Sequence, residues 1–220
     1  MTPYKLTEDE LRQEQRMVHR CSGAAAVVCA VMYGLAYLFL PRVLHFPDDL
    51  DSALTFWAGA ILFIVLWVMV GIGLVSRGRR LSAQDIRGSA YGPPSPRIAV
   101  YAAFLQNTLE QATVTILLLL AVLLLLRGEA MPFVGASVIL FAVGRVAFLR
   151  GYPGGAGTRA FGMALTALPS VVAFVVAAGS VIARVLRCTS RVYRRCHWRR
   201  QTLQGLQGSA LHFGLGRANP

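Results

Sequence analysis

Charged and amide side chains interrupt the apolar stretches of this sequence, and they are the residues best suited to chemistry. Asn107, Glu110 and Gln111 occur at spacings of three and four residues, which places them close together on one helix surface. Arg145 and Arg159 lie in or beside later apolar stretches. A carboxylate and two guanidinium groups could satisfy one another, or hold an anionic ligand through charge-assisted hydrogen bonds. The alternative is that the amide and carboxyl groups only join helices, and the spacing alone favours neither interpretation.

Metal and phosphate chemistry have less support. The four cysteines and four histidines show no metal-ligand spacing, and the histidines lie outside the polar cluster, so we expect no metal site. The glycine-rich segment 151–157 follows no strand and lacks the lysine of a phosphate-binding loop. We expect it to be a turn between helices.

Five apolar blocks must position these side chains. They cover residues 24–40, 54–75, 98–126, 131–149 and 161–185 of a 220-residue chain that is 55% apolar and 15% charged. The mean hydropathy is +0.55, far from the balance of a soluble domain. About 20 apolar residues suffice for a helix to cross a hydrocarbon core of about 30 Å. The sequence therefore predicts an all-α fold, an integral membrane helical bundle with five transmembrane helices.

The first block is the shortest, and it could be the apolar part of a signal peptide, with Arg16 and Arg20 before it. A signal peptide would end in a small-residue cleavage pattern, but Pro41 and Arg42 follow the block instead. We therefore expect a cytoplasmic segment over 1–23 and an uncleaved first transmembrane helix with its outer loop over 24–53.

Basic residues predict the orientation of the bundle. Segment 76–97 contains five arginines and is expected in the cytoplasm, whereas loop 42–52 contains three aspartates and is expected outside. Five spans would then place the basic tail, 187–220, on the outer face, against the positive-inside rule. We expect this tail to contact lipid headgroups or to form a poorly ordered extension. No recognition module accompanies it, so we expect no nucleic-acid partner.

Three motifs follow one another along the last three blocks. In chain order they are Asn107-x-x-Glu110, Arg145-x-x-Phe148 followed by Gly151-Tyr152, and Arg159 seven residues after that tyrosine. Together they resemble the MAPEG family, membrane-associated proteins in eicosanoid and glutathione metabolism. The resemblance covers about 54–186. The added first helix and the stretch 161–169 are similar to the mattrin-like branch of that family.

The resemblance implies a four-helix domain, usually assembled as a homotrimer with glutathione bound between protomers near the cytoplasmic side. It implies that Asn107, Glu110, Tyr152 and Arg145 bind glutathione as a cosubstrate, with Arg145 ordering the cluster rather than reacting. Arg159 would be the catalytic residue that stabilises the thiolate, as a nearby cation does for a thiol. The thiolate would attack a lipophilic electrophile or a lipid peroxide arriving from the bilayer, which makes the protein a glutathione-dependent transferase or peroxidase.

Two positions depart from the family pattern. Ala103 stands where an arginine is common, and Phe148 stands where a tyrosine often contacts the ligand. The alternative function is therefore a non-catalytic lipid-binding or scaffold protein with the same fold. A transporter would need discontinuous helices or an inverted repeat, and the sequence has neither. Without a recognised eukaryotic sorting signal, we expect a multi-pass protein of the bacterial inner membrane.

Overall fold

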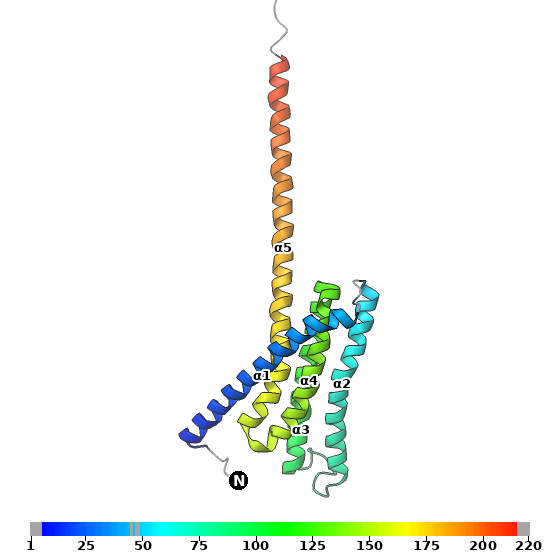
Figure 1. Ribbon diagram of the computed structural model, residues 1–220, viewed down its shortest axis with the longest axis vertical. Coiled ribbons are helices and arrows are strands. Elements are labelled where there is room, and N and C mark those ends of the chain that lie inside the picture. Colours follow the sequence, from blue (N-terminus) through cyan, green and yellow to red (C-terminus); the bar gives the residue numbers. More distant parts are fainter. Residues whose placement is uncertain (1–5, 45, 47–48, 215–220) are drawn as a thin grey trace, which may run out of the picture. The chain divides into compact units, whose positions relative to one another are not determined.

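The computed structural model describes residues 6–44, 46 and 49–214, and the side chains of these residues as far as Cys188. The regular structure in this part of the chain is helical, which confirms the predicted all-α fold (Figure 1). The helices, in chain order, are α1 (Glu8–Val43), α2 (Leu50–Arg80), α3 (Pro96–Leu126), α4 (Met131–Gly151) and α5 (Ala156–Gly214), with short 3-10 turns η1 (Arg127–Ala130) and η2 (Tyr152–Gly154).

Four helical segments of the described chain are long and apolar enough to cross a membrane. They are Glu8–Val43, Leu50–Arg80, Pro96–Gly154 and Ala156–Cys188. The third segment contains both α3 and α4, which run antiparallel because the chain reverses at η1. These segments make the chain an integral multi-pass membrane protein. The count of five separate spans stays a prediction, because two of the predicted blocks fall within this one segment.

The first helix begins sixteen positions before the predicted apolar block at residue 24. Its start is a capping box, in which the Thr7 hydroxyl accepts from the Glu10 backbone N–H and the Glu10 carboxylate accepts from the Thr7 backbone N–H at 2.8 Å. Glu8 and Asp9 in the first turn also favour a helix start, because they face its positive dipole end. The predicted cytoplasmic segment therefore includes part of α1. At the other end, Pro41 lies inside the helix, which continues to Val43.

Packing joins α1–α4 and the first part of α5. The main apolar core lies among α2, α3, α4 and α5, with Ile64, Leu119, Phe141 and Ala173 nearly or fully buried. Figure 1 shows α1 crossing α4 obliquely, and a smaller cluster that includes Leu140 joins α1 to the bundle. Many large apolar side chains on the outer surfaces of the helices are exposed, as expected where lipid is the solvent.

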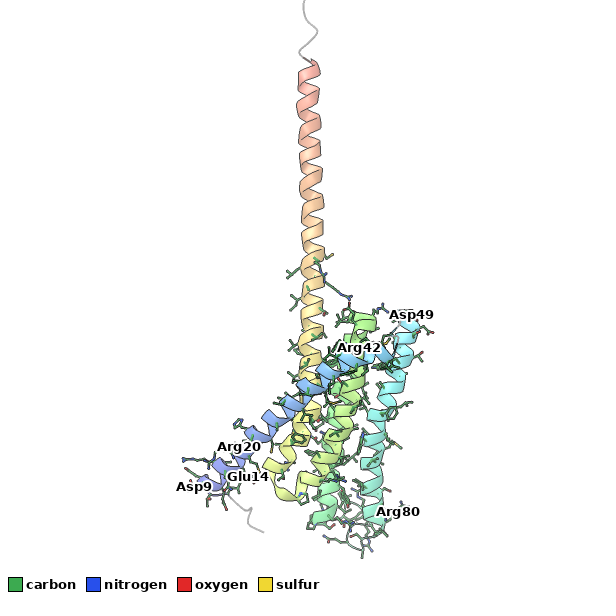
Figure 2. All side chains as sticks on the ribbon, viewed as in Figure 1. Asp9, Glu14, Arg20, Arg42, Asp49 and Arg80 are labelled. Atoms are coloured by element: carbon green, nitrogen blue, oxygen red, sulfur yellow. The ribbon has the colours of Figure 1, made fainter. Side chains whose placement is uncertain are left out.

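Charged side chains gather at the helix ends. Figure 2 shows Arg42 and Asp49 at one end of the bundle, and Asp9, Glu14 and Arg80 toward the other. Asp49 caps α2 by accepting from the Ser52 backbone N–H at 2.8 Å.

The chain divides into two compact units, 1–177 and 178–220. All the predicted site residues belong to the first unit. In the second, the backbone is helical as far as Gly214, and the poorly ordered tail expected from residue 187 stays a prediction. Arginine, glutamine and leucine are good helix formers, so a helix can form here without an apolar period. The domain boundaries proposed from the sequence stay predictions.

Candidate functional site

Arg145 lies at the centre of a buried polar network that joins three helices. Its side chain is 0% exposed on α4. One guanidinium N–H donates to the Asn107 side-chain oxygen of α3 at 2.8 Å, and another donates to the Thr166 hydroxyl of α5. The Arg145 Nε–H has no acceptor among the described residues. Asn107 and Arg145, two of the residues expected to bind the ligand, are therefore in direct contact.

Aromatic rings complete the surroundings of this cation. The guanidinium carbon of Arg145 lies 5.0 Å from the ring centroid of Phe148 and 5.4 Å from that of Phe141. Within the described residues, no carboxylate forms an ion pair with Arg145. A buried cation is tolerated only when hydrogen bonds and dipoles replace its hydration. Here an amide, a hydroxyl and two ring faces take that role.

Two glycines allow the helices that carry this network to approach closely. A Cβ atom on Gly162 of α5 would lie 2.3 Å from the Phe148 backbone nitrogen and 2.6 Å from the Gly144 carbonyl oxygen of α4. A Cβ atom on Gly144 would lie 2.7 Å from Thr166. Small residues at membrane helix contacts permit such packing. Without them, Thr166 would be held too far away to accept from Arg145.

Tyr152 and Arg159 form a second pair, at the turn between α4 and α5. The guanidinium carbon of Arg159 lies 5.0 Å from the Tyr152 ring centroid. Tyr152 in turn packs edge-to-face on Phe148, with centroids 5.7 Å apart. Phe148 therefore contacts both Arg145 and Tyr152, and it connects the two halves of the site.

Arg159 is half-buried and stands in the first turn of α5. Unlike Arg145, it has no hydrogen-bond or carboxylate partner in the part of the chain that the structure describes, so its N–H donors remain free to bind an anion. The helix start adds positive potential, because first-turn N–H groups have no acceptor within the helix. One of them is already used, since the Gly157 N–H donates to the Glu14 carboxylate of α1 at 2.8 Å.

Glu110 does not join the cluster that the spacing predicted. It lies on the exposed surface of α3, where its carboxylate accepts from the Gln106 side-chain amide at 2.8 Å. The interpretation that one carboxylate and two guanidinium groups satisfy one another is therefore wrong within this chain. Positions three apart differ by about 60° around the helix axis, and α3 is rotated so that the edge of its packed face falls between the half-buried Asn107 and the exposed Glu110. The ligand-binding roles of all these residues stay predictions.

Thr166 and Glu14 were missed by the sequence analysis. Thr166 had a readable signal, because Thr166 and Ser170 are hydroxyls one turn apart in an apolar block, and Ser170 bonds Thr115 of α3 at 2.9 Å. Glu14 gave no such signal, since its contact with the start of α5 depends on the course of α1. The described residues contain no group of three or more histidine, cysteine, aspartate or glutamate side chains arranged for a metal ion.

Comparison with known proteins adds one finding. Residues 54–179 match the model of the MAPEG family. This range contains Asn107, Glu110, Arg145, Tyr152 and Arg159. It leaves out α1 and the first four residues of α2. No curated protein and no solved structure gives a match to the chain. The similarity to the mattrin-like branch stays a prediction.

Proposed function

The chain belongs to the MAPEG family, and we propose that it binds glutathione as a cosubstrate, with Arg159 as the group that holds the thiolate. The observation that carries this proposal is the contrast between two arginines. Arg145 is fully buried and bonded, whereas Arg159 is half-buried with free donors beside an aromatic ring. A cation so placed can hydrogen-bond a sulfur anion and lower the pKa of a glutathione thiol.

Lowering that pKa favours two related reactions. In a transferase, the thiol gives its proton to solvent, the thiolate sulfur bonds to an electrophilic carbon, and the leaving group departs with the bonding electrons. In a peroxidase, the thiolate attacks a peroxide oxygen, the O–O bond breaks and an alcohol leaves. A second glutathione then displaces water from the oxidised sulfur to form the disulfide. Both reactions need the thiolate near the bilayer, where a lipophilic second substrate dissolves.

The other predicted residues take supporting roles in this proposal. Arg145 is a positioning residue, because its contacts fix α3, α4 and α5 while its guanidinium does not reach the surface. Asn107 holds Arg145 and keeps its own amide N–H groups available. Glu110 faces outward and could bind the ligand's amino group, or face a second protomer in the proposed homotrimer. We place the protein in the bacterial inner membrane.

A second function is favoured by a specific observation. Phe148 is 4% exposed and packs between Arg145 and Tyr152, so its ring is occupied by contacts within the chain, and phenylalanine has no hydroxyl to donate to a ligand. Ala103 of α3 offers no cation for a glutathione carboxylate. If these losses abolish binding, the same bundle would serve as a non-catalytic lipid-binding or scaffold protein.

Calorimetry on the detergent-solubilised protein separates these functions. We expect saturable binding of glutathione to the wild type and weaker binding to Arg159→Gln. Arg150→Gln is the matched control. Arg150 is an exposed arginine in the last turn of α4, close to Tyr152 in the sequence, but it has no ring contact with Tyr152. S-methylglutathione should bind both the wild type and Arg159→Gln weakly, since it has no thiol to ionise.

Activity gives the second measurement. Conjugation of glutathione to an activated aryl chloride should fall in Arg159→Gln and persist in Arg150→Gln. No binding to the wild type at millimolar glutathione, with the protein still folded, would overturn the enzyme proposal in favour of the scaffold.

A further inference from the structure

A cavity of about 320 Å³ lies between the end of α2 and the start of α3, apart from the residues of the proposed glutathione site. Its lining joins apolar side chains, among them Leu74 and Ile98, to two arginines, two serines and Tyr101. It stands where the apolar stretch of α2 gives way to the basic segment 76–97. A ligand bound here would meet hydrocarbon on one side and cations on the other.

The two arginines come from different helices. Arg77 belongs to the last turn of α2 and Arg97 to the first turn of α3. Arg97 donates from Nε–H to the Tyr101 hydroxyl at 3.2 Å, and its guanidinium carbon lies 5.8 Å from the Tyr101 ring centroid. This contact orients the guanidinium while leaving its terminal N–H groups free. Arg77 has no hydrogen-bond partner among the described residues.

Asp85, in the loop between the two helices, forms no ion pair with either arginine. Asp85 is 5% exposed, and its carboxylate accepts from the Ser82 hydroxyl and, at 2.8 Å, from the Ser95 backbone N–H. Ser82 and Ser95 both line the cavity. Asp85 therefore fixes the loop that forms one wall, because each of its carboxylate oxygens accepts a hydrogen bond from that loop.

The start of α3 adds further donors. Ser95 is the N-cap residue, but its side chain makes no capping hydrogen bond, and Pro96 has no N–H group. The N–H groups of Arg97 and Ile98 fall in the first turn, where the helix supplies no acceptor. Both residues line the cavity. An oxyanion there would receive backbone N–H groups and guanidinium groups together.

Gly78 closes the cavity on the side between the helices. A Cβ atom at this position would lie 2.3 Å from the Ile98 side chain, so glycine lets α2 and α3 meet closely. Leu74 and Leu81 add apolar lining, and the Leu81 side chain is exposed. This amphipathic shape suits a phosphate that carries hydrocarbon chains better than a freely soluble anion.

We propose that this cavity binds the phosphodiester headgroup of an anionic glycerophospholipid. Arg77 and Arg97 hold the phosphate oxygens, the start of α3 supplies N–H donors, and the acyl chains extend along α2 into the bilayer. This proposal is independent of the glutathione proposal, because the two sites share no residue.

The test uses the full chain in a neutral detergent. Binding of short-chain phosphatidylglycerol is measured by thermophoresis beside phosphatidylcholine, glycerol 3-phosphate and inorganic phosphate. A basic side chain near an anionic lipid contributes about fivefold in affinity, so we expect Arg77→Gln and Arg97→Gln each to weaken phosphatidylglycerol binding about fivefold. Phosphatidylcholine should bind much more weakly than phosphatidylglycerol.

Arg80→Gln is the matched control, because Arg80 ends α2 and does not line the cavity. It should change the affinity less than twofold. Equal losses in Arg80→Gln and Arg97→Gln would overturn the proposal in favour of general surface attraction. Competition by inorganic phosphate at the concentration at which the lipid binds would overturn the lipid as the ligand. Because Arg77 and Arg97 are exposed, both variants should keep the wild-type elution volume in size-exclusion chromatography. Tyr101→Phe tests the same cavity by removing the hydroxyl that accepts from Arg97.

Discussion

Replacing Thr166 with valine removes one acceptor from the buried Arg145 guanidinium while keeping the side-chain shape nearly constant. The two residues are 1% and 0% exposed, so water cannot replace the lost bond. A hydrogen bond to a charged group contributes about 1.5–3 kcal/mol, against about 0.5–1.5 kcal/mol for a neutral one. We therefore expect Thr166→Val to lower the free energy of unfolding by about 2 kcal/mol.

Thr115→Val is the matched control for this prediction. Thr115 is also buried, and its hydroxyl bonds Ser170 of α5 at 2.9 Å, so this bond likewise joins α5 to a neighbouring helix, α3 rather than α4, but without a charge. It should lower the free energy of unfolding by no more than about 1 kcal/mol, in line with neutral interhelical bonds in membranes.

Reversible unfolding in mixed micelles, followed by circular dichroism, measures both variants. An Arg145→Met background completes a double-mutant cycle, in which Thr166→Val should lose most of its effect. Equal destabilisation by Thr166→Val and Thr115→Val would refute the reasoning, as would an undiminished effect of Thr166→Val when Arg145 is absent.

Three further predictions follow from other contacts. Gly162→Ala should destabilise the protein by about 1–3 kcal/mol, because its Cβ would meet the α4 backbone at 2.3 Å, whereas Gly73→Ala, with open space around it, should not; thermal unfolding in detergent compares the two. Hydrogen bonds, first from the Ser82 hydroxyl, hold the pKa of Asp85 below its ordinary value of about 3.9. The stability that the ionised Asp85 contributes is therefore present above that pH and is lost as the pH falls below it. Wild type should lose more stability than Asp85→Asn between pH 5 and pH 3. Glu14→Ala removes the acceptor at the first turn of α5, which should cost about 1 kcal/mol and speed amide hydrogen exchange there.

The fold class could be predicted from the sequence. Apolar blocks longer than a bilayer core leave few alternatives to helices, since backbone groups in lipid must bond internally. The high cost of polar groups at membrane depth also indicated that these side chains would have polar partners, but the partner expected for the arginines was the Glu110 carboxylate and not the Asn107 amide. The bond from Arg145 to Thr166 was not predicted from the sequence. A threonine in an apolar block can equally bond the backbone of its own helix, so its presence does not identify a partner.

The position of Glu110 and the start of α1 were harder to predict. Spacing places Glu110 near Asn107 on α3, but it does not give the rotation of the helix against its neighbours. That rotation depends on close contacts such as Gly144 with Gly162, which are individually unremarkable in a sequence. The capping box at Thr7 can be recognised in the sequence. The predicted span nevertheless began at residue 24, because it was defined by the apolar block alone.

The burial of Arg145 also bears on how the chain enters its membrane. A lone arginine costs up to about 3 kcal/mol when a helix is inserted at the translocon. Asn107 on α3 is synthesised before Arg145, whereas Thr166 on α5 emerges after it. If α3 and α4 insert together as a hairpin, the Asn107 amide can accept a hydrogen bond from Arg145 as soon as α4 enters the membrane. Membrane integration of α4 should therefore depend on α3 more than on α5.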